Sequence, residues 1–317
     1  MTELKRYITS EDLKLHNKPG DLWISIHGKV YDVSDWVKDH PGGDLPLLNL
    51  AGQDVTDAFV AFHPASAWQY LDKFFSGYYL KDYTVSDVSK DYRRLVFEFS
   101  KMGLFEKKGH VACVTLCVMA MLFAVCVYGV LCCDSTWVHL FCGGLMGILW
   151  IQSGWMGHDS GHYQIMPTRR LNQYVQIVAG NCIAGVSICW WKRNHNAHHM
   201  ACNSLDFDPD LQHMPFFAQT TGSLDIMCSS WMDWFHGGLQ FQIEHHLFPR
   251  LPRCQLRKIS PFVKELCKKH NLPYNIVSFW KANELTCRTL RTAALQAQDL
   301  ANPVPKNLVW EAVNTHG

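Results

Sequence analysis

The 317-residue sequence contains no C-x-x-C pair, although it has 13 cysteines. Most of them lie in or beside apolar runs, so we expect reduced packing residues rather than a disulfide framework or a zinc site. There is no basic arm with interleaved aromatic residues, which argues against nucleic acid as a partner. The polar start, MTELKRYITS, has no apolar signal-peptide core, so we expect a cytosolic N-terminus.

Two apolar runs, at 111–133 and 136–156, are long enough to cross a bilayer, which takes about 20 apolar residues. Lysines precede the first run and two arginines follow the second. The positive-inside rule therefore predicts a transmembrane hairpin with both ends cytosolic, against the alternative of a buried hairpin in a soluble protein. A third run, at 174–191, is interrupted by Asn181, and we expect it to lie in the membrane interface.

A polar module precedes the apolar runs. The stretch LWISIHGKVYDVSDW alternates apolar and polar residues, which predicts a β-hairpin with its turn at His27-Gly28. In the following HPGGD motif, a tight loop presents His40, and His63 follows among short helical segments. Two neutral imidazoles that face each other across an apolar pocket are what a six-coordinate haem iron requires.

Residues 7–83 resemble cytochrome b5, and the HPGG match is specific. The resemblance implies an α+β domain in which His40 and His63 are the axial ligands of haem b, with a role in one-electron transfer. The acidic balance of this region would attract a basic reductase, and the expected partner is NADH-cytochrome b5 reductase.

Three histidine clusters follow the first apolar runs. Their motifs are GHDSGH, HNAHH and QIEHH, and each spacing places its imidazoles on one face of a helix. Three such clusters on the cytosolic side of a hairpin predict a metal centre, but imidazole suits iron, copper, nickel and zinc alike. The predicted ligands are His158, His162, His195, His198, His199, His245 and His246.

The pattern H-x-x-x-H, H-x-x-H-H, Q-x-x-H-H resembles the membrane fatty acyl desaturase family. With the haem domain and Gln242 in the third cluster, it is similar to the front-end desaturases, and longer phrases such as GHDSGHYQIM are similar to the plant Δ8 sphingolipid desaturases. The resemblance implies an all-α membrane domain at 106–317, joined through a linker at 84–105, with two non-haem irons that use O2 to form a carbon-8 double bond in a sphingoid base. It also implies a multi-pass protein of the endoplasmic reticulum membrane, with a lipid substrate and cytosolic histidine clusters.

Four further residues are candidates for supporting roles. Asp159 and Glu244 lie between ligand positions, where a carboxylate can fix an imidazole tautomer, although solvated carboxylates are an equal alternative. We favour Gln242 as a hydrogen-bond partner of a ligand over Gln242 as a ligand. His236, in WFHGG, is a candidate extra ligand.

The sequence departs from the family between His199 and Gln242, where the third and fourth spans of the family are missing. We therefore expect a chain that binds haem but binds the non-haem irons weakly. An oligomer with itself or with another desaturase would restore the missing walls of the acyl channel. Two alternatives remain open. One is a front-end desaturase of glycerolipid or CoA-linked acyl chains, and the other is an inactive short form that keeps electron-transfer or regulatory capacity.

Overall fold

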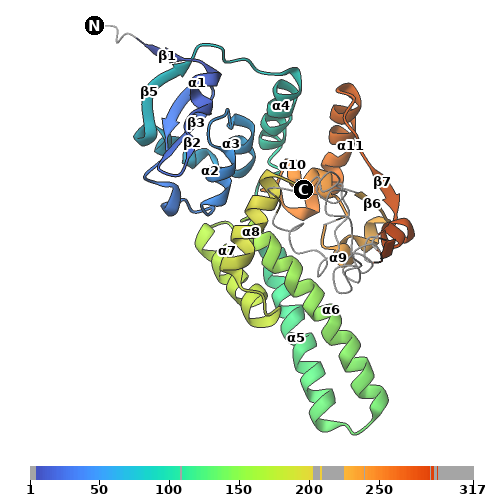
Figure 1. Cartoon of the computed structure of the whole chain (residues 1–317). Coiled ribbons are helices and arrows are strands. Elements are labelled where there is room, and N and C mark those ends of the chain that lie inside the picture. Colours follow the sequence, from blue (N-terminus) through green and yellow to red (C-terminus); the bar gives the residue numbers. More distant parts are fainter. Residues whose placement is uncertain are drawn as a thin grey trace, which may run out of the picture.

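The computed structural model describes residues 5–107, 109–202, 208, 225–238, 240–285, 287–288 and 291. The chain forms a sheet-containing N-terminal domain and a mainly helical second domain from which a long hairpin projects (Figure 1). The elements of the first domain are β1 (Arg6–Ile8), α1 (Ser10–Lys14), β2 (Asn17–Lys18), β3 (Asp21–Ile26), β4 (Lys29–Asp32), η1 (Val37–Asp39), α2 (Leu45–Leu50), α3 (Thr56–Phe62), η2 (Ala65–Phe74) and β5 (Phe75–Leu80).

The five strands form one sheet in the order β1-β5-β4-β3-β2, in which β1 is parallel to β5 and the other neighbours are antiparallel. The turn between β3 and β4 confirms the predicted hairpin. His27 and Gly28 both have positive φ, at 51° and 72°, as the two central residues of a tight hairpin turn do. The alternation in β3 buries Leu22 and Ile24 in one apolar cluster with Phe59 of α3, so that α3 packs on the sheet.

Residues 84–105, predicted as a linker, contain helix α4 (Asp87–Lys101). Its apolar stripe buries Tyr92, Leu95 and Phe99 in a cluster with residues of the second domain. The polar face of α4 accounts for its reading as a linker, because a helix with one narrow apolar stripe is polar over most of its surface. This packing ties the two domains together rather than leaving them on a free tether.

The projecting hairpin consists of α5 (His110–Cys132) and α6 (Thr136–Gly161), which pack along each other. Within the described residues, α5 is the one helix long and apolar enough to cross a membrane, and a second would result if the bent α7–α8 segment were one span. Large apolar side chains on the hairpin face outward, and Leu131 and Trp137 are 77% and 79% exposed. Such a surface is suited to lipid. The second predicted span, at 136–156 in α6, stays a prediction, because α6 does not meet the same criterion and its apolar run contains the polar side chains of His139 and Gln152.

The third apolar run does not form one straight helix. It divides into α7 (Arg169–Gln176), the π-helical segment η3 (Ile177–Ile183) and α8 (Ile188–Met200), with a bend of 109° before α8. Gly157 of α6 and Gly180 of η3 allow a close approach, since a Cβ at Gly157 would lie 3.2 Å from the Gly180 Cα. The bend turns the polar α8 away from the hairpin and toward the N-terminal domain (Figure 1).

The remaining elements lie on the other side of α6. They are β6 (Asp225–Met227), η5 (Ser230–Met232), α9 (Asp233–His236), α10 (Gln242–Leu247), α11 (Arg253–Lys269) and β7 (Ile276–Ser278). The parallel β6–β7 pair is an addition to the all-α domain expected from the sequence, and strands of three residues are too short to show a period. Helix α11 packs on α4 through Ile259 and Val263.

Candidate functional site

Two imidazoles face each other in the N-terminal pocket. The ring centroids of His40 and His63 are 6.0 Å apart. An imidazole nitrogen binds a metal at about 2.0–2.1 Å, so two rings on opposite sides of one iron have centroids about 6 Å apart. Gly42 is required beside them, because a Cβ there would lie 2.8 Å from Cε1 of His40.

The tautomers of both rings leave Nε2 for a metal. Nδ1 of His40 donates to the carbonyl of Gly43 at 2.7 Å, and Nδ1 of His63 donates to the carbonyl of Phe59 at 3.2 Å. Burial lowers the pKa of His40 and lowers the pKa of His63 to about 4. Both rings are therefore neutral at physiological pH, which is the form that binds haem iron.

The three histidine clusters of the sequence meet at one place in the fold. The end of α6 supplies His158 and His162, α8 supplies the second cluster and α10 supplies the third. One group has its potential ligand atoms all within 4.8 Å of one another and consists of His158, His162, His195, His199 and His245. Residues separated by more than 80 positions thus present five imidazoles to one point.

The nitrogens of this group fit a metal. Nε2 of His158, His162 and His245 and Nδ1 of His199 are buried and have no hydrogen-bond partner among the described residues. Buried polar atoms are almost always paired, so converging lone pairs of this kind indicate an absent cation. Burial and the neighbouring imidazoles hold the pKa of His245 well below its usual range and lower the pKa of His246 to about 3, which keeps both neutral.

A second group adjoins the first and contains His198, Cys202 and His246. The rings of His199 and His246 are 4.6 Å apart at their centroids, so the two groups share a border. Sγ of Cys202 lies 3.3 Å from Nδ1 of His246. Sequence reasoning missed Cys202, although its position one turn after His198 is a spacing that could have indicated it.

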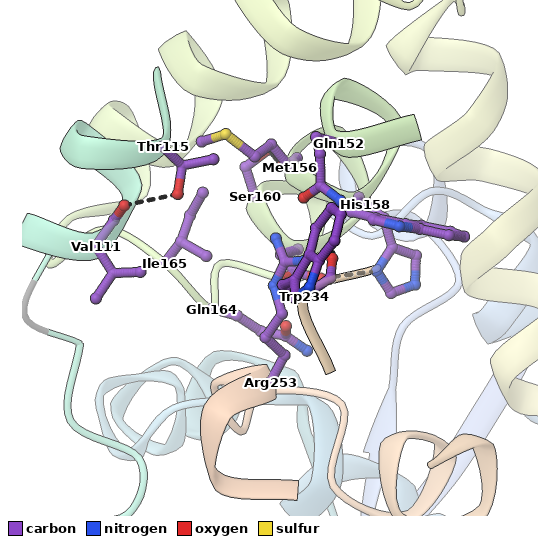
Figure 2. A network of polar contacts seen from close by, with 12 residues as sticks. Val111, Thr115, Gln152, Met156, His158, Ser160, Gln164, Ile165, Trp234 and Arg253 are labelled. Carbon is purple, nitrogen blue, oxygen red and sulfur yellow. Dashed lines mark hydrogen bonds and ion pairs between the residues drawn. The ribbon is translucent and has the colours of Figure 1, made fainter. Parts of the chain in front are cut away.

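Carboxylates orient two of these imidazoles. Asp159 Oδ1 accepts from Nδ1 of His158 at 3.0 Å, and its other oxygen pairs with Arg253 of α11 at 2.6 Å. Figure 2 shows the polar network to which His158 and Arg253 belong. Asp208 accepts from Nδ1 of His198 at 2.9 Å, and no sequence signal indicated that residue.

The other supporting candidates lie elsewhere. Glu244 is fully buried, but it accepts a hydrogen bond from Tyr274 at 2.6 Å rather than from a histidine. The hydroxyl of Tyr274 also lies 2.5 Å from Asp225, so that its single proton is shared between the two carboxylates, and burial beside Glu244 raises the pKa of Asp225 to about 7. His236 contacts Phe235 and Phe279 and belongs to neither histidine group, so the geometry gives its assignment as a ligand no support. Gln242 begins α10, and its proposed role stays a prediction.

The fold and the two sites define a haem-binding domain joined to a membrane-associated domain with a histidine-rich metal centre. Residues 9–80 match the family profile of the cytochrome b5-like heme/steroid binding domain, and residues 134–227 and 215–278 match that of the fatty acid desaturases. A solved cytochrome b558 of Ectothiorhodospira vacuolata is 32% identical over 23% of this chain and 95% of its own, with a TM-score of 0.22.

Several plant desaturases are similar along nearly the whole chain. The acyl-lipid (9-3)-desaturase of Borago officinalis is 51% identical, and the alignment covers 99% of both proteins. Delta(8)-fatty-acid desaturase 2 of Arabidopsis thaliana is 47% identical over 99% of both, and the Delta(8)-fatty-acid desaturase of Helianthus annuus is 46% identical over 99% of this chain and 97% of its own.

This chain belongs to the fatty acid desaturase family, and it carries an N-terminal cytochrome b5-like domain. It is an oxidoreductase whose cofactors are haem and non-haem iron, with O2 as the usual co-substrate, a lipid substrate and a membrane setting. The resemblance stated from the sequence is thereby confirmed. The Borago alignment extends over 445 positions, more than the 317 residues present here, so the relative has residues opposite gaps in this chain.

Proposed function

We propose that this chain is a front-end desaturase that introduces a double bond at carbon 8 of sphingoid long-chain bases in the endoplasmic reticulum membrane. The observation that carries the proposal is the convergence of five imidazoles, from three separate helices, beside a haem domain of the same chain. The similarity to four Delta(8)-fatty-acid desaturases at 44–47% identity supports the position of the double bond. NADH-cytochrome b5 reductase would supply the electrons.

The residues of the two sites would have the following roles. His40 and His63 would hold haem b. The seven cluster histidines would hold two non-haem irons, which when bound supply the activation of O2 needed to remove two hydrogens from a methylene pair. Trp191, whose ring stacks on His195 at 4.4 Å, would cover one side of the group and exclude water. Asp159 and Asp208 would keep His158 and His198 in the tautomer that leaves Nε2 for the metal.

A second candidate substrate is an acyl chain in a glycerolipid or linked to CoA, and the 51% identity to the Borago acyl-lipid (9-3)-desaturase favours it. The residues around the histidines are compatible with either chain, because both present an unactivated methylene pair. A third candidate is an electron carrier or regulatory partner without desaturase activity. The interval between His199 and Gln242, which is shorter than the family pattern of two further spans, favours that candidate.

The test is expression in a yeast whose sphingoid bases lack a carbon-8 double bond, with polyunsaturated-fatty-acid precursors supplied in parallel. Mass spectrometry of bases and acyl chains distinguishes the three candidates: a carbon-8 unsaturated base, a new acyl double bond, or neither with a normal haem spectrum. His158→Ala is the matched control, because it removes an imidazole of the metal group and leaves the haem domain intact. A product that persists in His158→Ala would contradict the desaturase proposal.

A further inference from the structure

The haem domain is docked directly on the helices that carry the second and third histidine clusters. Asn196, which lies between ligand candidates on α8, donates to the carbonyl of Gly42 at 2.8 Å, in the loop that follows His40. Arg193, one turn earlier, pairs with Asp44 at 3.2 Å. These contacts hold the HPGGD loop against α8.

The other haem-ligand candidate is held from the third cluster. Arg250, which follows α10, donates from its guanidinium to the carbonyl of His63. Its guanidinium also lies 5.3 Å over the ring of Phe105, and burial lowers the pKa of Arg250. The His40 loop is therefore held against α8, and the backbone of His63 is held against the segment that follows α10.

One side chain bridges the two sites. Phe62 is the last residue of α3 and is bonded through the backbone to His63. Its ring lies edge-on to the ring of His199, with centroids 5.8 Å apart and planes at 78°. His199 in turn belongs to the five-imidazole group and is 7% exposed, while Phe62 is partly buried.

We propose that Phe62 is the contact through which electrons pass from the haem held by His63 to the metal held by His199. Each transfer oxidises one ferrous haem to ferric and reduces one ferric non-haem iron to ferrous, and no bond breaks and no proton moves. A flavin reductase that uses a nicotinamide donor reduces the haem again. This inference rests on the proposed function and deepens it, because it assigns the electron entry point of that site.

The geometry explains why electron delivery needs no diffusing carrier. Electron transfer slows steeply with distance, and here the ring contact joins a residue adjacent to one metal ligand with a second metal ligand. The contacts of Arg193, Asn196 and Arg250 keep this distance short. A preorganised contact of this kind costs no encounter step.

The experiment follows reoxidation of the haem in the purified chain without oxygen. Non-haem iron per chain is measured first, the haem is reduced by a flash with a soluble photoreductant, and its absorbance is recorded. In the wild-type protein we expect a first-order phase whose rate does not depend on protein concentration. Phe62→Leu should slow that phase, because it removes the ring that contacts His199. Phe62→Tyr, which keeps the ring, should restore it.

Phe97→Leu is the matched control, because Phe97 is 69% exposed on α4, away from both sites, and should not change the rate. Haem spectrum and iron content are compared in all variants, so a folding defect is recognised by its loss of either cofactor. An unchanged rate in an iron-loaded Phe62→Leu protein would overturn the proposal, as would a wild-type protein with no first-order phase.

Product analysis is run in parallel. A fast phase without desaturated product contradicts the proposed function alone, and product with an unchanged Phe62→Leu rate contradicts the electron contact alone.

Discussion

Asp159 should determine how tightly the metal group binds iron. Its carboxylate is 2% exposed and accepts from Nδ1 of His158, while Arg253 of α11 neutralises its charge. In Asp159→Ala the acceptor disappears, so His158 can rotate or adopt the tautomer that places its proton on Nε2. Either change removes one lone pair from the group.

The loss of a carboxylate that orients a metal-bound histidine typically costs about 10- to 100-fold in metal affinity. Arg253 adds little to this cost, because its side chain is 24% exposed and its guanidinium reaches water when the carboxylate is removed. Asp159→Asn keeps an oxygen acceptor for the Nδ1–H and should bind iron with an affinity between those of the wild type and Asp159→Ala. The assay is competition for ferrous iron with a chromophoric chelator, using the detergent-purified chain.

Two controls make the result interpretable. Asp87→Ala removes a carboxylate that pairs with Lys90 on the exposed face of α4, and it should leave iron affinity unchanged. The haem spectrum reports the integrity of the N-terminal domain in every variant. Wild-type affinity in Asp159→Ala, or weaker binding in Asp159→Asn than in Asp159→Ala, would refute the role assigned to the hydrogen bond.

Three further outcomes are expected. In the haem-free chain the pKa of His63 is lowered to about 4, against an ordinary value of 6.5, so the unfolded chain binds the proton more tightly. The free energy of unfolding should therefore fall by up to about 3 kcal/mol as the pH drops from 6.5 toward 4. Denaturant titrations of the haem-free chain measure this pH dependence, which should be weaker in His63→Gln. Phe99→Ala should cost about 3–5 kcal/mol in the same titration, since the ring is fully buried between α4 and α11. Gly161→Ala should lower iron content despite the better helix propensity of alanine, because its Cβ would collide with the ring of Trp191, which stacks on His195; an unchanged iron content would contradict this.

The sequence predicted the local parts of both sites because their signals are local. The β-hairpin at His27-Gly28 follows from alternation and from two residues that tolerate positive φ. The histidine motifs indicated a metal because spacings of three and four residues put imidazoles on one helix face. At 84–105 the same local signals did not indicate the buried stripe of Tyr92, Leu95 and Phe99, because α4 is polar over most of its surface.

Partners that depend on tertiary packing could not be read from the chain. Glu244 was as good a candidate as Asp159 by position, yet Tyr274, 30 residues later, occupies its carboxylate. The carboxylate of Glu244 lies against the hydroxyl of Tyr274, which also contacts Asp225 of β6, while Asp159 reaches the ring of His158 beside it. Position next to a histidine in the sequence therefore does not decide which carboxylate contacts an imidazole.

The short interval after His199 affects the substrate channel more than the metal group. All five imidazoles of the group come from α6, α8 and α10, which are held by the approach of Gly157 to Gly180, by the Arg253–Asp159 pair and by the α4–α11 core. If the chain lacks two spans after His199, as we expect from the sequence, it would keep these contacts while losing walls for the lipid chain. We accordingly expect iron binding and electron transfer to survive in this chain under conditions in which product formation requires a second desaturase subunit.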